Sequence, residues 1–394
     1  MSRPSLLARF SAAGVSVSLG MYTLIAAGML ALLVLIPAVA FETPEVAGRE
    51  QTRKATVRRV LEERLQAGPR GTETYQRLEL DLDGEPILIE RSFLPRDALA
   101  IKPGPGDRVL VSRVDGPGGP AYFIEDYVRE GGLWWLALAF GALVLVIGRR
   151  QGLAALFGMA ISLAVILRFI IPGIVAGHDP VIISVAGAGA IMASSLYIAH
   201  GMNRKTTTAL LGTMLGLAIT AILARFSIEL VALTGLADEE SATLNIITEG
   251  GINPEGLLLA GIIIGALGVL DDVTIAQASS VYEIRAANPL LPAAELYRRA
   301  MNIGRDHIAS TVNTLFLAYA GAALPLLIIL SLQAEPAGVL LNREFLATEI
   351  ARTLVGSIGI LAAVPLTTAL AALAARAGRA AGGGTARATS LAAD

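Results

Sequence analysis

Two adjacent carboxylates, Asp271 and Asp272, interrupt the long apolar stretch 256–283. A helix over this stretch places Asp271 roughly 20 Å from either end, at a rise of about 1.5 Å per residue. That depth lies near the middle of a bilayer, where a charged side chain costs at least about 2.5–3.5 kcal/mol. Because burial and mutual repulsion both oppose ionisation, at least one of the two acids is expected to hold a proton near neutral pH. A proton carrier needs this property.

The spacing of small residues gives the same helix a distinct face. At about 100° per residue, Gly261, Gly265, Gly268 and Asp272 lie close to one line along the helix. Small residues allow membrane helices to approach closely, so the three glycines are predicted to pack and Asp272 is expected to point into a helix–helix contact. The alternative is a structural pair, in which one Asp is hydrogen-bonded to a neighbouring helix without any role in transport.

Polar side chains near the aspartates, and on the next apolar segment 308–332, are candidates for a proton or ion relay. These groups are able to solvate the acids or a bound cation. The alternative is a set of interhelical hydrogen bonds that only hold the bundle together. The predicted relay consists of Asp271, Asp272, Thr274, Gln277, Thr311, Asn313 and Thr314.

A second charged pair, Arg225 and Glu229, has i, i+4 spacing within the segment 207–234. On one helix face these side chains are expected to form an internal ion pair that lowers the cost of membrane insertion. An outward-facing vestibule for an ion or substrate is the alternative.

The elements that position these residues are predicted to be membrane helices. Only 16% of the 394 residues are charged, against about a quarter in ordinary soluble domains. Eight apolar runs, most of them long enough to cross a bilayer, predict an all-α polytopic bundle of about eight transmembrane helices. The runs are 14–41, 133–148, 152–175, 181–201, 207–234, 256–283, 308–332 and 345–374.

Lys and Arg alternate between the short loops and predict that both termini are cytoplasmic. Residues 1–41 would then form a cytoplasmic N-terminus and first helix, 132–375 a seven-helix domain, and 376–394 a disordered cytoplasmic tail. Ala38-Val-Ala40 has the form of a signal-peptide cleavage site. The apolar run before it exceeds the roughly 7–15 residues of a signal core, which favours a retained anchor.

The insert 42–131 differs from its surroundings, since it holds about half of the charged side chains. Alternating residues 77–82, the turn Asp83-Gly84 and the run 86–90 predict a β-hairpin. Residues 107–112 and 121–125 are further strand candidates on either side of a Gly/Pro turn. We expect a small extracytoplasmic barrel or sandwich, either a structural cap or assembly module or a part that handles substrate.

Several chemistries are excluded or disfavoured by residue usage. There is no cysteine, and the three histidines are far apart in the sequence, so we predict neither a metal site nor a cofactor. A formal net charge of -2 argues against nucleic acid as a partner. Walker, Gly-x-Ser-x-Gly and His-Glu-x-x-His motifs do not occur, so we do not expect an enzyme.

Two stretches carry a resemblance to a known family. Residues 265–284, which include Gly-Val-Leu-Asp-Asp-Val-Thr, and residues 304–321, which begin Gly-Arg-Asp-His-Ile, resemble the YibE/F family of bacterial multipass membrane proteins. The resemblance extends over most of residues 130–375. It implies a multipass protein of the bacterial cytoplasmic (inner) membrane.

The pattern Gly-x-x-Asp-Asp at 268–272 is also similar, more distantly, to the repeat unit of RND exporters and SecDF. In those families aspartates of the fourth transmembrane helix are tied to proton coupling, a role that the resemblance transfers to Asp271 and Asp272. The chain would supply a single RND/SecDF-like half, which implies a homodimer or a second RND-like half.

Two functions are therefore expected. The first is a transporter in the lipid bilayer, coupled to proton (or Na+) movement through the two aspartates, with an unknown substrate. The second is a non-transporting accessory or assembly factor for protein export, which binds a partner protein through its extracytoplasmic β domain.

Overall fold

The computed structural model describes residues 52–68, 71–94, 101–116, 119–332 and 335–388. The chain divides into two compact units. One unit is Glu45–Ile147 and contains the β-strands, and the other comprises Met1–Pro44 with Gly148–Asp394 and contains the helical bundle. The predicted first span, 14–41, and the Ala38-Val-Ala40 motif lie outside the described residues.

The strands form one antiparallel sheet of order β3-β2-β1-β4-β5. The described residues therefore do not form the two packed sheets of a sandwich, and β3 and β5 are the sheet's edges rather than partners that close a barrel. One face of the sheet is apolar and buried, with Leu78, Leu80 and Val109 at its centre. The strands are β1 Arg53–Gly68, β2 Gly71–Leu82, β3 Glu85–Phe93, β4 Arg108–Gly116 and β5 Gly119–Tyr127.

The predicted hairpin is confirmed. β2 and β3 pair from Leu82↔Glu85 outward, and the two turn residues Asp83 and Gly84 have φ angles of 55° and 96°. Positive φ at both central residues is the conformation that Asp-Gly favours in two-residue hairpins. The second predicted pair of strands is also present, as β4 and β5.

The hairpin carries a pH-sensitive contact at Asp81. Arg58 donates to its carboxylate through Nε at 3.1 Å and Nη2 at 2.6 Å, and the Gly84 amide donates at 2.8 Å. These hydrogen bonds, that of Arg58 foremost, lower the pKa of Asp81 below its ordinary value. A lowered native pKa contributes stability that is present above the unfolded pKa of about 4 and is lost as pH falls further.

We therefore expect the β2–β3 hairpin to lose protection as pH falls below about 4. Hydrogen exchange on the full chain, corrected for the intrinsic exchange rate at each pH, measures this loss. Asp81→Asn is expected to lower protection at neutral pH and to weaken its dependence on pH. An unchanged pH dependence in the variant would assign the effect to other groups.

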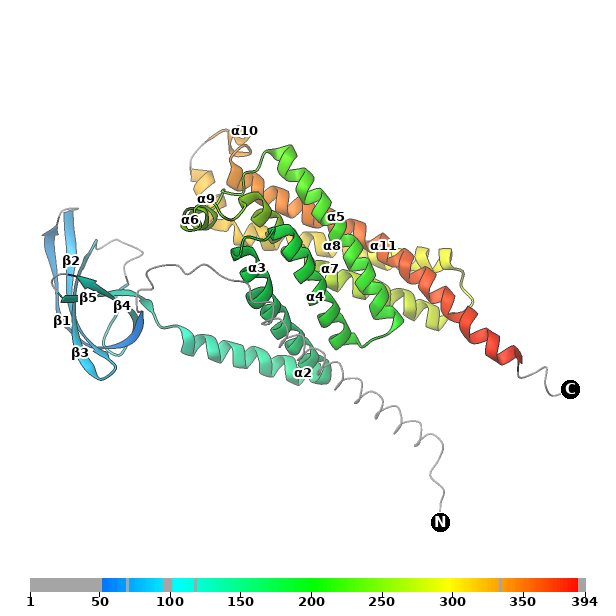
Figure 1. Cartoon of the computed structure of the whole chain (residues 1–394), viewed down its shortest axis with the longest axis horizontal. Coiled ribbons are helices and arrows are strands. Elements are labelled where there is room, and N and C mark those ends of the chain that lie inside the picture. The colour runs from blue at the N-terminus through cyan, green and yellow to red at the C-terminus, as the bar shows by residue number, and fades with distance from the viewer. Residues whose placement is uncertain (1–51, 69–70, 95–100, 117–118, 333–334, 389–394) are drawn as a thin grey trace, which may run out of the picture. The chain divides into compact units, whose positions relative to one another are not determined.

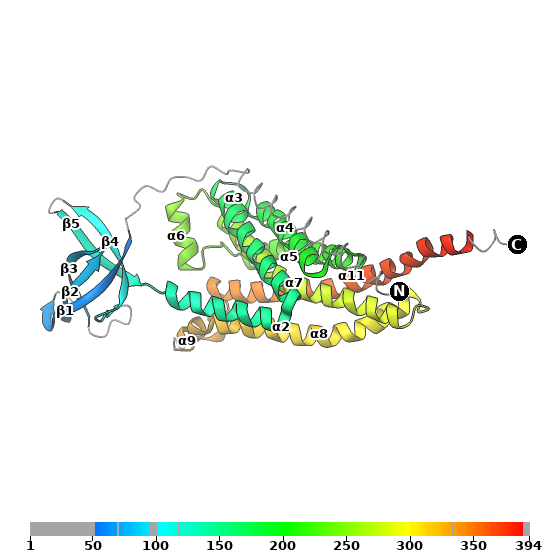
Figure 2. The same cartoon turned by 90° about the horizontal axis from the view of Figure 1, so that it is seen from below.

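The helical bundle runs along the rest of the chain, with α5, α7 and α11 side by side in both views (Figures 1 and 2). The helices are α2 Glu130–Val165, the π-helix Ile166–Ile170, α3 Ile171–Val175, α4 Pro180–His200, α5 Arg204–Val231, α6 Glu239–Ile247, α7 Pro254–Ala287, α8 Ala293–Ala322, α9 Leu324–Leu332, α10 Ala337–Leu340 and α11 Glu344–Ala388.

The prediction of about eight spans is wrong. Among the described residues, five helices are long and apolar enough to cross a membrane, or up to six if the bent pair α8 and α9 is one span. The runs 133–148 and 152–175 join into the single stretch Glu130–Val175, whose backbone leaves helical geometry at Arg149 (φ 49°, ψ -121°). The boundary predicted between these runs therefore coincides with a kink between two helices, although the two together count as one candidate span.

The C-terminal helix also differs from expectation. α11 continues as helix through Ala388, over residues that were predicted to be a disordered tail. Alanine and arginine, which are frequent there, favour a helix, whereas Gly378 and the run Gly382–Gly384 oppose it, so helix propensity alone does not explain the continuation.

Small residues hold the centre of the bundle together. A Cβ added to Gly216 of α5 would lie 2.8 Å from the Ala363 Cβ of α11 and 3.1 Å from Leu270 Cδ2 of α7. A Cβ added to Gly212 would collide with Thr367 of α11, and one added to Gly359 of α11 would collide with Thr220 of α5. The close approach of α5 and α11 thus depends on glycines other than the three that were predicted to pack, which are all on α7.

Candidate functional site

The two aspartates of α7 lie in different surroundings. Asp271 is half-buried, and its Oδ1 is fully buried with no hydrogen-bond partner in the part of the chain that the structure describes. Asp272 is exposed. Within the protomer, then, Asp272 does not point into a helix–helix contact as predicted, because α5 and α11 pack on the other side of α7, where Leu270, Val273 and Thr274 are buried.

The glycine face of α7 is open in the described structure. A Cβ added to Gly261 or Gly268 would meet nothing within 4 Å, and one added to Gly265 would meet only the Tyr319 hydroxyl, at 3.3 Å. Gly261 and Gly268 therefore do not pack against a helix of the same protomer, whereas Gly265 lies against Tyr319 of α8. Packing of this face against a second chain stays a prediction.

A pair of buried hydroxyls lies next to Asp271. Thr274 is fully buried, shares a hydrogen bond of 2.5 Å with Thr213 of α5 and donates to the Asp271 carbonyl at 3.2 Å. Thr213 is not among the predicted relay residues, although the spacing of threonines in the sequence indicates it. Thr206, Thr213 and Thr220 recur every seven residues and so share one face of α5, and all three are buried.

Gln277 links two helices. Its Nε2 donates to the Ala300 carbonyl of α8 at 2.8 Å, and a Cβ on Gly304 would lie 3.0 Å from the same amide group. This arrangement fixes α8 against α7, so the geometry of Gln277 matches the alternative of a bundle-holding hydrogen bond.

The three predicted relay residues on α8 do not surround the aspartates. Thr311 is half-buried, whereas Asn313 and Thr314 are exposed, and Thr314 donates back to the Ser310 carbonyl of its own helix at 2.9 Å. No hydrogen bond joins these three residues to either aspartate within the described ranges. The structure therefore joins Thr274 to the main-chain carbonyl of Asp271, not to its carboxyl group, and joins none of the polar residues of α8 to Asp271.

Most of the helical part of the chain matches a known protein family. The model of the family described as YibE/F-like protein matches residues 136–377, which is more than half of the chain. The chain belongs to this family. Comparisons with curated proteins and with solved structures give no match. The matched range includes α4 to α9 and the aspartate pair, whereas the five-stranded sheet lies before it.

In this YibE/F-like protein, Arg225 and Glu229 lie within ion-pair distance. Arg225 Nη2 is 2.9 Å from Glu229 Oε1, and Nη1 is 3.5 Å from Glu255 Oε2 at the start of α7. All three side chains are largely exposed. The pair therefore ties α5 to α7 near one end of the bundle.

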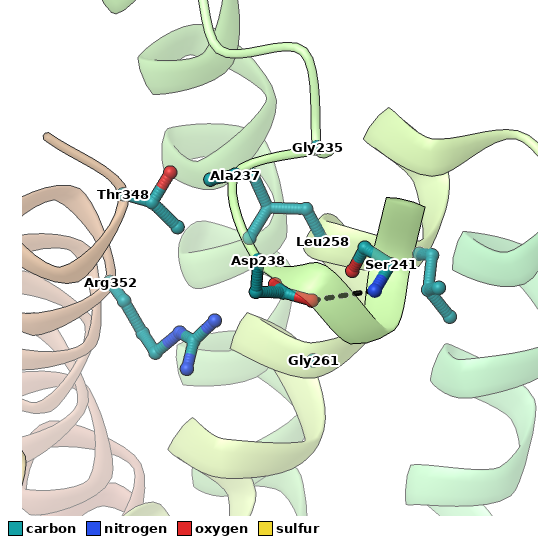
Figure 3. A pocket seen from close by; sticks show the side chains of 9 residues that line it. Gly235, Ala237, Asp238, Ser241, Leu258, Gly261, Thr348 and Arg352 are labelled. Atoms are coloured by element: carbon teal, nitrogen blue, oxygen red, sulfur yellow. Dashed lines mark hydrogen bonds between the residues drawn. The ribbon is translucent and has the colours of Figure 1, made fainter. Parts of the chain in front are cut away.

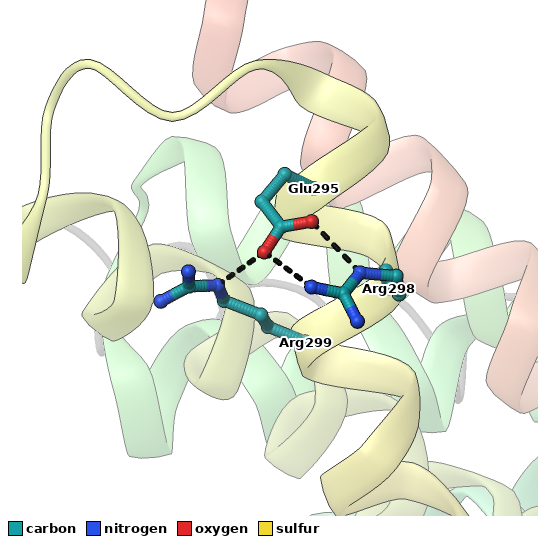
Figure 4. Close-up of polar contacts among 3 residues, drawn as sticks. All are labelled: Glu295, Arg298 and Arg299. Atoms are coloured by element: carbon teal, nitrogen blue, oxygen red, sulfur yellow. Dashed lines mark hydrogen bonds and ion pairs between the residues drawn. The ribbon is translucent and has the colours of Figure 1, made fainter.

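Arginines at the start of α8 are also paired within their own helix. Glu295 accepts from Arg298 Nε at 2.8 Å and Nη2 at 2.7 Å and from Arg299 Nε at 2.6 Å (Figure 4). These arginines contributed to the predicted cytoplasmic charge pattern. Their pairing stabilises the first turns of α8.

Among the described residues, no group of three or more His, Cys, Asp or Glu side chains is placed to hold a metal ion.

Proposed function

We propose that this YibE/F-like protein is a transporter coupled to proton (or Na+) movement through Asp271 and Asp272. The observation that carries the proposal is the buried Oδ1 of Asp271, which has no hydrogen-bond partner among the described residues. This atom lies in the middle of a helix that is long and apolar enough to cross a membrane.

A buried polar atom without a partner costs about 1–3 kcal/mol. A bound proton or cation offsets that cost at a carboxylate, and loss of the proton restores it, so Asp271 is suited to alternate between two states. Asp272 is exposed beside it and supplies a second carboxyl with which a proton can exchange. Ionisable residues within membrane helices are functional by default, which supports the same assignment.

The open face of α7 supports a second part of the proposal, a homodimer or an assembly with another RND-like half. An exposed acid and three glycines would otherwise face hydrocarbon, where a carboxylate is costly. A second chain placed on this face would bury Asp272 next to small residues that allow close approach.

Both termini are proposed to be cytoplasmic, with the sheet outside.

Proton flux in liposomes tests the transport proposal. Protein carrying both Asp271→Asn and Asp272→Asn is expected to lose flux by about 100-fold, the scale on which a positioned proton-transfer group acts. Glu283→Gln is the matched control, because Glu283 is an exposed carboxylate on the same helix. Equal flux in the double variant and the wild type would rule out coupling through the pair.

An accessory or assembly function is the second candidate, and one feature of the sheet favours it. The five strands belong to a compact unit of their own and precede the range that the family model matches, so the transport proposal leaves them without a role. This function predicts that deletion of residues 42–131 abolishes activity while the two Asp substitutions leave it intact. The transport proposal predicts that the Asp substitutions abolish it.

A further inference from the structure

A small pocket lies at the end of the helical bundle that carries α6. Its volume is about 90 Å³. Helices α7 and α11 form part of its wall, with Gly261 and Arg352 among the lining residues. Another part of the wall is the loop between α5 and α6 (Figure 3), which contributes Gly235, Ala237 and Asp238. The pocket is therefore bounded on one side by a loop rather than by a membrane helix.

Burial holds this loop in place only weakly. Thr234, Leu236 and Asp238 are exposed, and Ala237 is half-buried. The helix that follows the loop, α6, contains no buried residue. Because a segment with few buried apolar contacts opens at a low cost in free energy, polar contacts decide whether the loop stays closed over the pocket.

One carboxylate fastens the loop to α11. Glu344, the first residue of α11, accepts through Oε1 from the Thr234 amide at 2.5 Å and from the Gly235 amide at 3.2 Å. The Thr234 hydroxyl donates to the same carboxylate at 2.9 Å. Hydrogen bonds to an ionised acceptor are roughly twice as strong as those between neutral groups. Glu344 is therefore the main polar contact between the loop and α11.

We propose that residues 234–247, the loop together with α6, form a lid over the pocket and that Glu344 latches the lid shut. The core holds this segment at its two ends, since Leu233 is 3% exposed and Ile252 is 6% exposed. Release of the latch lets the lid move between these ends and admits water to Thr348 of the pocket wall, which is 4% exposed with the lid closed. The inference goes beyond proton coupling, because opening is measured without flux.

The absence of cysteine from the chain makes the lid testable. Thr348→Cys places one thiol in the pocket wall, and its rate of modification by a water-soluble methanethiosulfonate reagent is measured on the purified full-length protein in detergent. Adding Glu344→Ala is expected to raise this rate by about tenfold or more, the scale of one hydrogen bond to a charged group. Glu344→Gln keeps an acceptor oxygen and should raise the rate less. Leu258→Cys, in the same pocket wall, is a second reporter and is expected to respond in the same way.

Two controls separate opening of the lid from general loosening of the bundle. Ala351→Cys reports on a residue of α11 that is 6% exposed and packs in the core instead of lining the pocket, so Glu344→Ala should leave its modification rate unchanged. Glu335→Gln breaks the neighbouring ion pair with Arg343, at 2.6 Å, and leaves the latch intact, so it should not change the rate at Thr348→Cys. Equal rates at Thr348→Cys with and without Glu344→Ala, or an equal rise at Ala351→Cys, would overturn the proposal.

Discussion

Gly216→Val is expected to lower the free energy of unfolding of the helical bundle by about 3 kcal/mol, the upper end of the usual cost of overpacking. The reason is the contact of α5 with two other helices. A Cβ at Gly216 would already lie 2.8 Å from Ala363 Cβ and 3.1 Å from Leu270 Cδ2. Because the first contact is to a side chain with no rotamer to change, α5 and α11 must move apart.

Unfolding of the purified protein in detergent, followed by circular dichroism against denaturant, measures this effect. Gly189→Val is the matched control, because it makes the same substitution in the middle of α4, where an added Cβ would meet only Met214 Sδ, at 3.9 Å. We expect the control to stay close to the wild type in stability. Equal loss in both variants would mean that helix propensity, rather than packing between α5 and α11, sets the effect.

Asp271→Asn alone is expected to remove most proton flux, with a fall of about 100-fold. An amide has the shape of the carboxyl but cannot carry a proton through the cycle, and the buried Oδ1 of Asp271 has no other partner in the described structure. Asp272→Asn is expected to cause a smaller fall, because Asp272 is exposed. Thr213→Val, which removes the hydroxyl bonded to Thr274, should lower flux without abolishing it.

Local patterns of the sequence predicted local structure well. The Asp83-Gly84 turn and its flanking strands follow from the alternation of apolar and polar residues and from the backbone conformation that Asp-Gly favours. A hairpin is predictable in this way because it is determined by residues close together in the chain. The long apolar runs likewise predicted the membrane helices α4, α5, α7 and α11. The count of spans was too high, since five helices of the described residues, or six with the bent pair α8 and α9, are long and apolar enough to cross a membrane. The boundary predicted between 148 and 152 does coincide with a break in the helix at Arg149.

Contacts between helices were harder to predict. Helical periodicity correctly placed Gly261, Gly265, Gly268 and Asp272 on one face of α7, but periodicity does not say which helix, if any, covers a face. The closely packed glycines are instead Gly212 and Gly216 of α5. These glycines are four residues apart, and Thr220 continues the spacing. Small residues at this spacing indicate close packing between membrane helices, so the contact of α5 was predictable from the sequence.

The polar surroundings of the candidate sites were predicted only in part. Thr274 does lie beside Asp271, because both are on one helix. Its partner Thr213 is 61 residues away in the chain, and a single sequence carries no information about such pairings. The same holds for the small pocket lined by Thr348 and Arg352 of α11, Gly261 of α7 and Asp238 before α6.

The most direct test of proton movement through the aspartates is a single comparison in liposomes. Asp271→Asn and Glu283→Gln proteins are reconstituted at equal density, and proton flux is followed with a trapped pH-sensitive dye under an imposed pH gradient. The account predicts flux near the wild-type rate for Glu283→Gln and a loss of about 100-fold for Asp271→Asn. Wild-type flux in the Asp271→Asn protein would contradict it.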